Sequence, residues 1–316
     1  MTRPRRELVS TQDTPYYHIV SRCVRRAYLC GIDHVTQNNY EHRRQWVVDR
    51  LRVLSSLFAI DIAAYAVMSN HYHIVLKLDP AQLEELDDFE IIRRWTCIFK
   101  GPMIIQQYKK HGRVEPSHQQ TVDDIAAVWR ARLADLGWFM KCLNEPIAKR
   151  ANKEDHCTGH FWEARYKSQA LRTEEALLAC MAYVDLNPVR ARMASKPEES
   201  SYTSIKERTK PVFVLKDATD NQLQRGDLES DLPTVKPLLA FSANIATHSK
   251  MLIPCSLEDY LQLVDWTGRS IRPDKRGAIS AQLPPILQRL QLPPDDWLQH
   301  ATKFELMVRK KKALGS

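Results

Sequence analysis

The chain lacks any hydrophobic run long enough to cross a membrane. None of its 316 residues belongs to an unbroken apolar segment of about 18 residues, the length of a transmembrane helix. Residues 1–15 are basic and are not followed by an apolar core, so they do not have the form of a secretory signal. The sequence therefore predicts a cytoplasmic protein without a membrane partner.

Paired cysteines are also missing. The seven cysteines are odd in number, include no Cys-x-x-Cys pair and stand mostly in apolar surroundings. Disulfide frameworks of secreted proteins have an even, regularly spaced set of cysteines. We therefore expect reduced, buried thiols, and we find no internal repeat.

Positive charge is what the sequence has in excess. The formal net charge is +8 and the pI is near 9.1. Such a balance favours a polyanionic partner, and nucleic acid is the usual one. Many basic proteins never touch DNA, so the charge indicates this partner only weakly by itself. With 44% hydrophobic residues, the chain can form one large domain or two modest ones.

The first part of the chain predicts three strands and one helix. Residues 17–24 are rich in β-branched and aromatic side chains and predict a strand. Residues 43–58 have apolar side chains at helical spacing. Residues 61–68 and 71–78 predict two further strands, and the two residues between them suit a tight hairpin turn.

A longer helical stretch follows. Residues 91–110 predict one helix, and residues 123–152 predict two helices that meet near residues 144–146. Residues 159–171 predict an extended segment or strand, which precedes another helix. The resulting order of elements predicts an α+β fold with a ferredoxin-like split β-α-β sheet and a helical insertion.

The composition and periodicity of the sequence change beyond about residue 195. Residues 196–237 are polar with little periodicity and predict a linker or a loosely packed segment, whereas residues 256–266 are again helical. We therefore divide the chain into a domain of residues 1–195 and a mostly helical C-terminal extension of residues 196–316, whose role the sequence does not indicate.

His71 and His73 form a candidate metal site. Side chains alternate across a strand, so both imidazoles lie on one face, about 7 Å apart along the strand. The apolar Tyr72, Ile74, Leu76 and Leu78 share the other face. Two such imidazoles can hold a metal if a third ligand comes from elsewhere. The alternative is two unrelated histidines. Valine at position 75 excludes a histidine-triad hydrolase.

A candidate nucleophile lies on the helix that Thr173 can cap and Pro188 ends. Tyr183 and Asn187 are four residues apart and point the same way, with alanines on the preceding turns of that face. If this helix crosses the open face of the sheet, Asn187 completes the metal site and Tyr183 faces a phosphate. The alternative is a core tyrosine and a capping asparagine.

Three motifs together resemble those of a known family. They are MSNHYHIVL, GHFWEARYKSQAL and YVDLNPVRARM, in this order. They resemble the HUH-type single-tyrosine transposases, and among these the REP-associated tyrosine transposases, which are related to small insertion-sequence transposases. The resemblance covers residues 1 to about 195. Each motif is weak singly, and their combination is specific.

The resemblance implies a ferredoxin-like fold and cleavage and joining of single-stranded DNA. His71 and His73 correspond to paired ligands of a divalent metal, Mg²⁺ or Mn²⁺, and Asn187 to the third ligand. Tyr183 corresponds to the nucleophile, which would form a 5′-phosphotyrosine link. We interpret Tyr166, near the second motif, as structural.

Several arginines are candidates for DNA contact. Arg3, Arg5 and Arg6 would form a basic arm along phosphates, and Arg190 and Arg192 directly follow the tyrosine helix. A solvated basic surface is the alternative for each cluster. The expected partner is single-stranded or hairpin DNA, bound by a monomer or a homodimer.

Two other functions remain open. A domesticated relative would bind hairpin DNA without cutting it, although the intact His71, His73, Tyr183 and Asn187 argue against lost chemistry. A metal-dependent nuclease that uses water would leave no protein–DNA adduct, and Tyr183 would then be structural.

Overall fold

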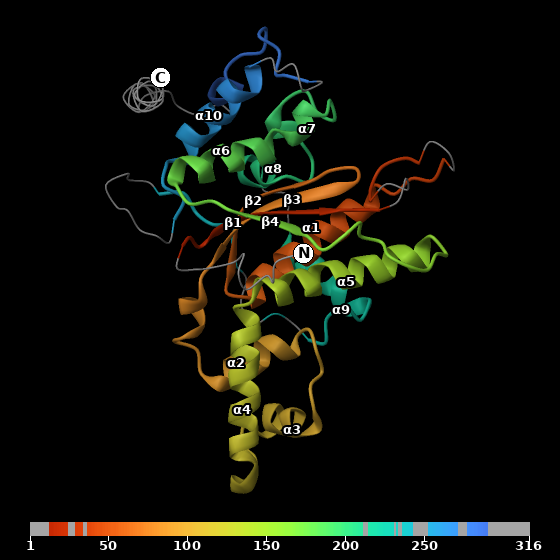
Figure 1. Cartoon of the computed structure of the whole chain (residues 1–316), viewed down its shortest axis with the longest axis vertical. Helices are drawn as coiled ribbons and strands as arrows, with labels where there is room; N and C mark the ends of the chain where they lie inside the picture. The colour runs from red at the N-terminus through yellow and green to blue at the C-terminus, as the bar shows by residue number, and fades with distance from the viewer. Residues whose placement is uncertain are drawn as a thin grey trace, which may run out of the picture.

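A four-stranded antiparallel sheet forms the centre of the structure, with helices on both faces (Figure 1). The computed structural model describes residues 13–24, 29–33, 37–210, 214–230, 232, 236–242, 252–270 and 277–289. The strands are β1 (Tyr16–Arg22), β2 (Ile60–Val67), β3 (His71–Leu78) and β4 (Lys167–Ala170). Their order in the sheet is β2-β3-β1-β4. The combination of helices with an antiparallel sheet confirms the α+β class.

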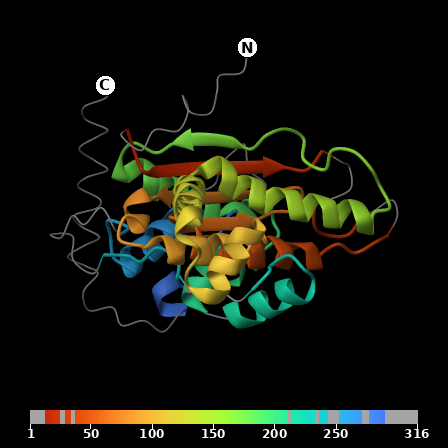
Figure 2. The same ribbon diagram turned by 90° about the horizontal axis from the view of Figure 1, so that it is seen from below.

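Helix α1 (His42–Leu57) connects β1 to β2, and β3 lies between these two strands. The β2–β3 hairpin has the expected two-residue turn, which the backbone N–H of Met68 closes by donating to the carbonyl of His71 at 2.8 Å. Figure 2 shows β4 beside β1 at one edge of the sheet. The hairpin therefore places the histidine strand in the interior of the sheet.

The two faces of β3 meet different helices, as its alternation predicts. Tyr72, Ile74 and Leu76 belong to a core shared with α1 and α5 (Leu136–Glu154). Val75 belongs to a second core under α6 (Glu174–Asp185), together with small β2 residues such as Ala64. Because helices cover both faces, every residue of β2 is buried.

The helical insertion contains one more break than the sequence predicts. The single helix expected over residues 91–110 is wrong: α2 (Asp88–Thr96) and α3 (Met103–His111) are separate helices. Gly101 between them has φ of +72°, a left-handed conformation that a helix cannot continue through. Pro102 then begins the next helix without needing a backbone N–H donor.

The second break also lies elsewhere than expected. Helix α4 (Pro116–Leu133) ends well before residues 144–146, and Asp135 caps α5 by accepting from the N–H of Trp138. Pro146 lies inside α5 and cannot donate to the carbonyl of Cys142, four residues earlier. The buried Arg50 donates its Nε to that carbonyl at 3.0 Å, which explains why the proline does not end the helix.

The remaining elements are short, apart from α10. Within residues 159–171 only β4 is a regular strand, and Trp162 forms a single bridge with Cys23. The other helices are η2 (Pro80–Leu83), α7 (Asn187–Arg190), η3 (Pro197–Glu199), α8 (Ser204–Thr209), α9 (Leu215–Gln224), α10 (Leu257–Arg269) and α11 (Ile286–Arg289).

The described part of residues 196–237 is not a linker, which corrects the expectation. Helix α8 packs on β2, and α9 packs on α1. Lys236 forms an ion pair with Asp61 of β2 at 2.9 Å, and Gln222 accepts from Arg50 at 3.1 Å. Polar side chains anchor this segment, so its lack of apolar periodicity did not reveal its packing. The boundary at residue 195 stays a prediction.

Two expectations from composition can be compared with the structure. No helix in the described ranges is both long and apolar enough to span a membrane. The seven cysteines form no disulfide bond, and five are buried as expected, whereas Cys157 is exposed and Cys180 is partly exposed.

Candidate functional site

Three histidines meet on the face of the sheet that lies under α6. His71 and His73 come from β3, and their rings are 4.8 Å apart between centroids. This is closer than the spacing of about 7 Å expected along the strand, because the two rings turn toward each other. His18 of β1 joins them: Val20 is the cross-strand partner of His73, so His18 is its diagonal neighbour.

His18 was not among the site residues predicted from the sequence. The alternation of β1 alone indicates that His18 and Val20 share a face, but the register with β3 decides which residues they meet. In that register Nε2 of His18 lies 2.9 Å from Nδ1 of His73. Nδ1 of His71 lies 2.6 Å from Oδ1 of Asn70 in the hairpin turn. Each β3 imidazole is thus held at the same ring nitrogen.

Burial keeps two of these imidazoles neutral. Desolvation lowers the pKa of His18 to about 4. It also lowers the pKa of His71 to about 4, with a smaller contribution from the positive charge of Arg22. Near pH 7 both rings are therefore uncharged, which is the form of histidine that binds a metal.

Helix α6 begins as the sequence predicts and lies over β2 and β3. The Thr173 hydroxyl accepts from the N–H of Ala176 at 3.1 Å, which confirms the cap. Leu177 and Val184 are buried in the second core, which also contains residues of β2 and β3. Tyr183 is 38% exposed, and its ring centroid lies 5.6 Å from that of His73 and 6.2 Å from that of His18.

Asn187 follows in α7 rather than at the end of the tyrosine helix. Helix α6 ends at Asp185, and Pro188 lies in the first turn of α7. Asn187 is buried, and its Nδ2 makes no hydrogen bond within the described residues. Amide oxygen and nitrogen exchange places by a simple flip, so the unsatisfied position suits an amide oxygen that binds a cation.

The donor set of this site fits a divalent cation. In the described part of the chain, no group of three His, Cys, Asp or Glu side chains could hold a metal. The buried amide of Asn187 is a donor of another type. Imidazole nitrogen with amide oxygen is a borderline set that Mn²⁺ accepts more readily than Mg²⁺.

Asp185 anchors the tyrosine helix from its far side. Its Oδ1 accepts from the Ser204 hydroxyl at 2.6 Å and from the N–H of Ile205 at 3.0 Å, and its Oδ2 accepts from the Tyr260 hydroxyl at 2.5 Å. Asp185 is fully buried, and desolvation raises the pKa of its carboxyl above the ordinary value. The C-terminal extension therefore holds α6 through a buried carboxylate.

The predicted DNA-contacting arginines separate into three groups. Arg190 is 7% exposed and donates to the carbonyls of Ser270 and Thr267, each at 2.6 Å. This corrects its predicted role, because the guanidinium holds the extension instead of facing solvent. Arg192 is exposed beside it. Arg3, Arg5 and Arg6 lie outside the described residues.

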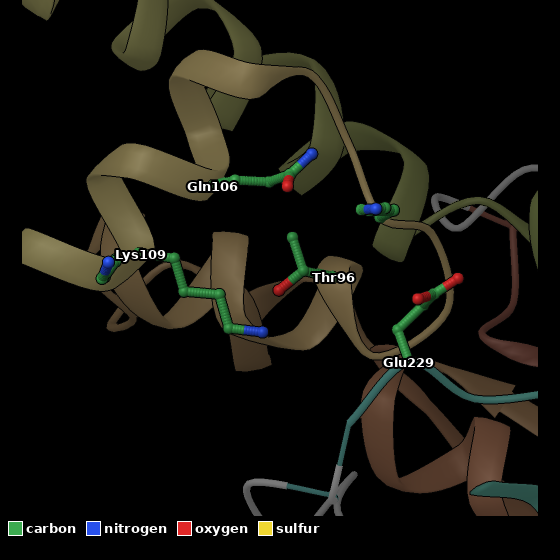
Figure 3. Close-up of a pocket in the computed structure, with 6 residues that line it drawn as sticks. Thr96, Gln106, Lys109 and Glu229 are labelled. Atoms are coloured by element: carbon green, nitrogen blue, oxygen red, sulfur yellow. The ribbon is translucent and has the colours of Figure 1, made fainter.

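A second basic feature lies on the helical insertion. A hollow of about 380 Å³ is lined by Thr96, Lys100, Gln106, Lys109, Lys110 and Glu229 (Figure 3). Five of these residues belong to α2, α3 and their connection, which extend away from the sheet (Figure 1). The hollow is therefore separate from the histidine face.

Comparison with known proteins gives a weak structural similarity. No family model matches the chain, and no curated protein does. A solved structure described as "the REP associates tyrosine transposase bound to a REP hairpin" is similar over 72% of this chain and 94% of its own. The two chains are 11% identical, and the TM-score is 0.33. This similarity is too low to show a common fold.

Proposed function

We propose that this chain is a transposase of the HUH tyrosine type, which cleaves and rejoins single-stranded or hairpin DNA through a phosphotyrosine link. The observation that carries the proposal is the position of Tyr183, whose ring lies 5.6 Å from that of His73. A tyrosine of the core would be buried, yet Tyr183 is 38% exposed. Tyr166 is 8% exposed and belongs to the core on the opposite face of the sheet.

The proposal includes a ferredoxin-like assignment of the fold. The β1–α1–β2 unit has β3 between its strands, and β4 extends the sheet beside β1. This strand order supports the assignment to a split β-α-β fold. In this assignment α2 to α4 belong to the insertion, and residues 1–195 form the catalytic domain.

The proposed cofactor is a divalent cation, Mg²⁺ or Mn²⁺. His71 and His73 would bind it through imidazole nitrogens, and Asn187 through its amide oxygen. When bound, the cation would polarise the scissile phosphate and offset negative charge as the transition state forms.

The chemistry assigned to the chain itself is nucleophilic attack by Tyr183. The phenol oxygen attacks phosphorus in line and forms the new P–O bond, while the bond to the 3′ oxygen breaks. The phenol loses its proton, and the leaving 3′ oxygen gains one. A phosphodiester replaces a phosphodiester, so a 3′-hydroxyl can attack the phosphotyrosine and rejoin a strand.

The remaining parts of the proposal concern the partner and its location. The net charge of +8 favours DNA as the partner. We assign contact with a strand to Arg192, which is exposed and follows the tyrosine helix in the sequence. The proposed state of the DNA-binding protein is a monomer or a homodimer. We assign the protein to the cytoplasm.

The test is covalent capture of DNA on a denaturing gel. Labelled single-stranded hairpin DNA is incubated with Mn²⁺ and wild type, Tyr183→Phe or Tyr108→Phe. Tyr108 is a matched control, because it is partly exposed and packs against Phe89 in the insertion. We expect an adduct with wild type and Tyr108→Phe and none with Tyr183→Phe.

Other results would identify the competing functions. Cleavage without an adduct, unchanged in Tyr183→Phe, would show a nuclease that uses water. Binding of several hairpins without cleavage by any of the three proteins would show a binding protein that has lost its chemistry.

A further inference from the structure

We infer that His18 is a positioning residue, which orients His73 toward the proposed metal through a hydrogen bond between their rings. The inference rests on the proposed function and deepens it, because it assigns a third histidine to the same site. His18 comes from a different strand from His71 and His73, and it is not one of the ligands assigned above.

The contact between His18 and His73 has the geometry of an in-plane hydrogen bond. The nitrogens are 2.9 Å apart, the ring centroids are 5.1 Å apart, and the planes differ by 14°. Such values describe two nearly coplanar rings joined edge to edge. The N–H of one ring therefore points along the lone pair of the other, which is the favourable direction.

Only one proton arrangement in this pair suits metal binding. A neutral imidazole carries one N–H and one lone pair. If His18 donates, the proton of neutral His73 is on Nε2, and no lone pair remains for a metal. If Nδ1 of His73 donates to Nε2 of His18, the lone pair of His73 is on Nε2 and can bind a cation.

His71 shows the same arrangement with a different acceptor. Its Nδ1 lies 2.6 Å from Oδ1 of Asn70, an amide oxygen that can only accept. In this orientation of the Asn70 amide, Nδ1 of His71 donates the proton and Nε2 carries the lone pair. Histidine ligands usually donate their second N–H to such an acceptor, which fixes the tautomer and the ring orientation. His18 performs for His73 what Asn70 performs for His71.

The position of His18 does not suit a third ligand. Its Nε2 is directed at His73. The described residues also contain no group of three His, Cys, Asp or Glu side chains arranged for a metal.

The experiment measures Mn²⁺ affinity of the full chain without DNA, by titration calorimetry. His18→Phe keeps a ring but removes the acceptor, and His18→Gln keeps an acceptor oxygen. His160→Ala, a change at an exposed histidine, is the control. We expect His18→Phe to weaken Mn²⁺ binding about 10- to 100-fold, His18→Gln to restore most of the affinity, and the control to match wild type. If His18→Phe does not fold by circular dichroism, His18→Leu replaces it.

Nitrogen couplings in pulsed electron paramagnetic resonance of bound Mn²⁺ separate positioning from ligation. We expect two imidazoles on Mn²⁺ in both wild type and His18→Gln. A third imidazole that disappears in His18→Gln would overturn the inference, because His18 would be a ligand. Equal affinity of wild type, His18→Phe and His18→Gln would also overturn it. Absence of Mn²⁺ binding by wild type would instead refute the metal site of the proposed function.

Discussion

The two halves of the candidate site are held in different ways. The histidine half lies on two adjacent strands, and the register between β1 and β3 brings His18 and His73 together. The tyrosine half lies on α6 and α7, which distant residues hold: Ser204 and Tyr260 bind Asp185, and Thr267 binds Arg190. Sheet pairing therefore builds one half, and side-chain anchors in the C-terminal extension place the other.

This difference assigns a structural role to the described part of the extension. Gly277 shows how closely it packs, because a Cβ added there would lie 2.1 Å from the carbonyl oxygen of Val189 in α7. Changes in the extension should therefore act on the tyrosine half and leave the histidine half intact.

The largest effect is expected on the histidine half. His71→Ala and His73→Ala each remove a proposed metal ligand, and we expect either to slow strand cleavage about 1,000-fold or more. Binding of hairpin DNA should persist. Single-turnover cleavage and filter binding are the measurements, with His160→Ala as control. Cleavage at the wild-type rate in both variants would remove the metal from the mechanism.

The next effect concerns the anchor of the tyrosine half. Asp185→Ala leaves two hydroxyls and one backbone N–H without their shared acceptor. We expect a loss of about 3 kcal/mol in the free energy of unfolding, measured with urea. At temperatures where the variant is folded, adduct formation should fall while Mn²⁺ affinity changes less. A variant as stable as wild type would contradict the anchoring role.

A pH effect is expected from the histidine half. Burial lowers the pKa of His18 and His71 to about 4, whereas an unfolded histidine titrates near about 6.5. Between these pH values the unfolded chain binds more protons than the folded chain. The contribution of the two neutral histidines to the free energy of unfolding is therefore complete above about pH 6.5 and is lost as the pH falls toward 4. Urea unfolding in EDTA should show that the free energy of unfolding falls more steeply between these pH values for wild type than for the double variant His18→Gln, His71→Gln. Parallel profiles would contradict the pKa shifts.

The smallest effect is expected on hairpin binding, where variants of Arg190 and Arg192 can be compared. Arg192→Ala should weaken hairpin binding a few-fold and reduce the salt dependence of log Kd by about one. Arg190→Ala should leave both unchanged in the folded protein but lower the free energy of unfolding by about 2 kcal/mol, since two carbonyls lose a charged donor. Equal effects of both variants on binding would show that Arg190 also reaches DNA.

Much of the local structure was predictable from the residues. The bounds of β3, the two-residue hairpin turn and the Thr173 cap follow from short-range rules, because alternation and capping depend on neighbouring residues. The predicted helix break near Pro146 is wrong, because the effect of this proline depends on a distant residue. Arg50 donates to the carbonyl of Cys142, which Pro146 leaves without a backbone donor. The break at Gly101 was a local signal that was missed.

Alternation along the strand was enough to place His71 and His73 on one face of β3. The spacing of Tyr183 and Asn187 predicted one continuous helix, but Asn187 lies in α7. The contact of His18 with His73, and the contact of Arg190 with the extension instead of solvent, follow from the folded structure. The periodicity of side chains predicts which residues share a face, because local backbone geometry fixes that periodicity. Strand register and packing decide what that face meets, because they depend on residues far apart in the chain.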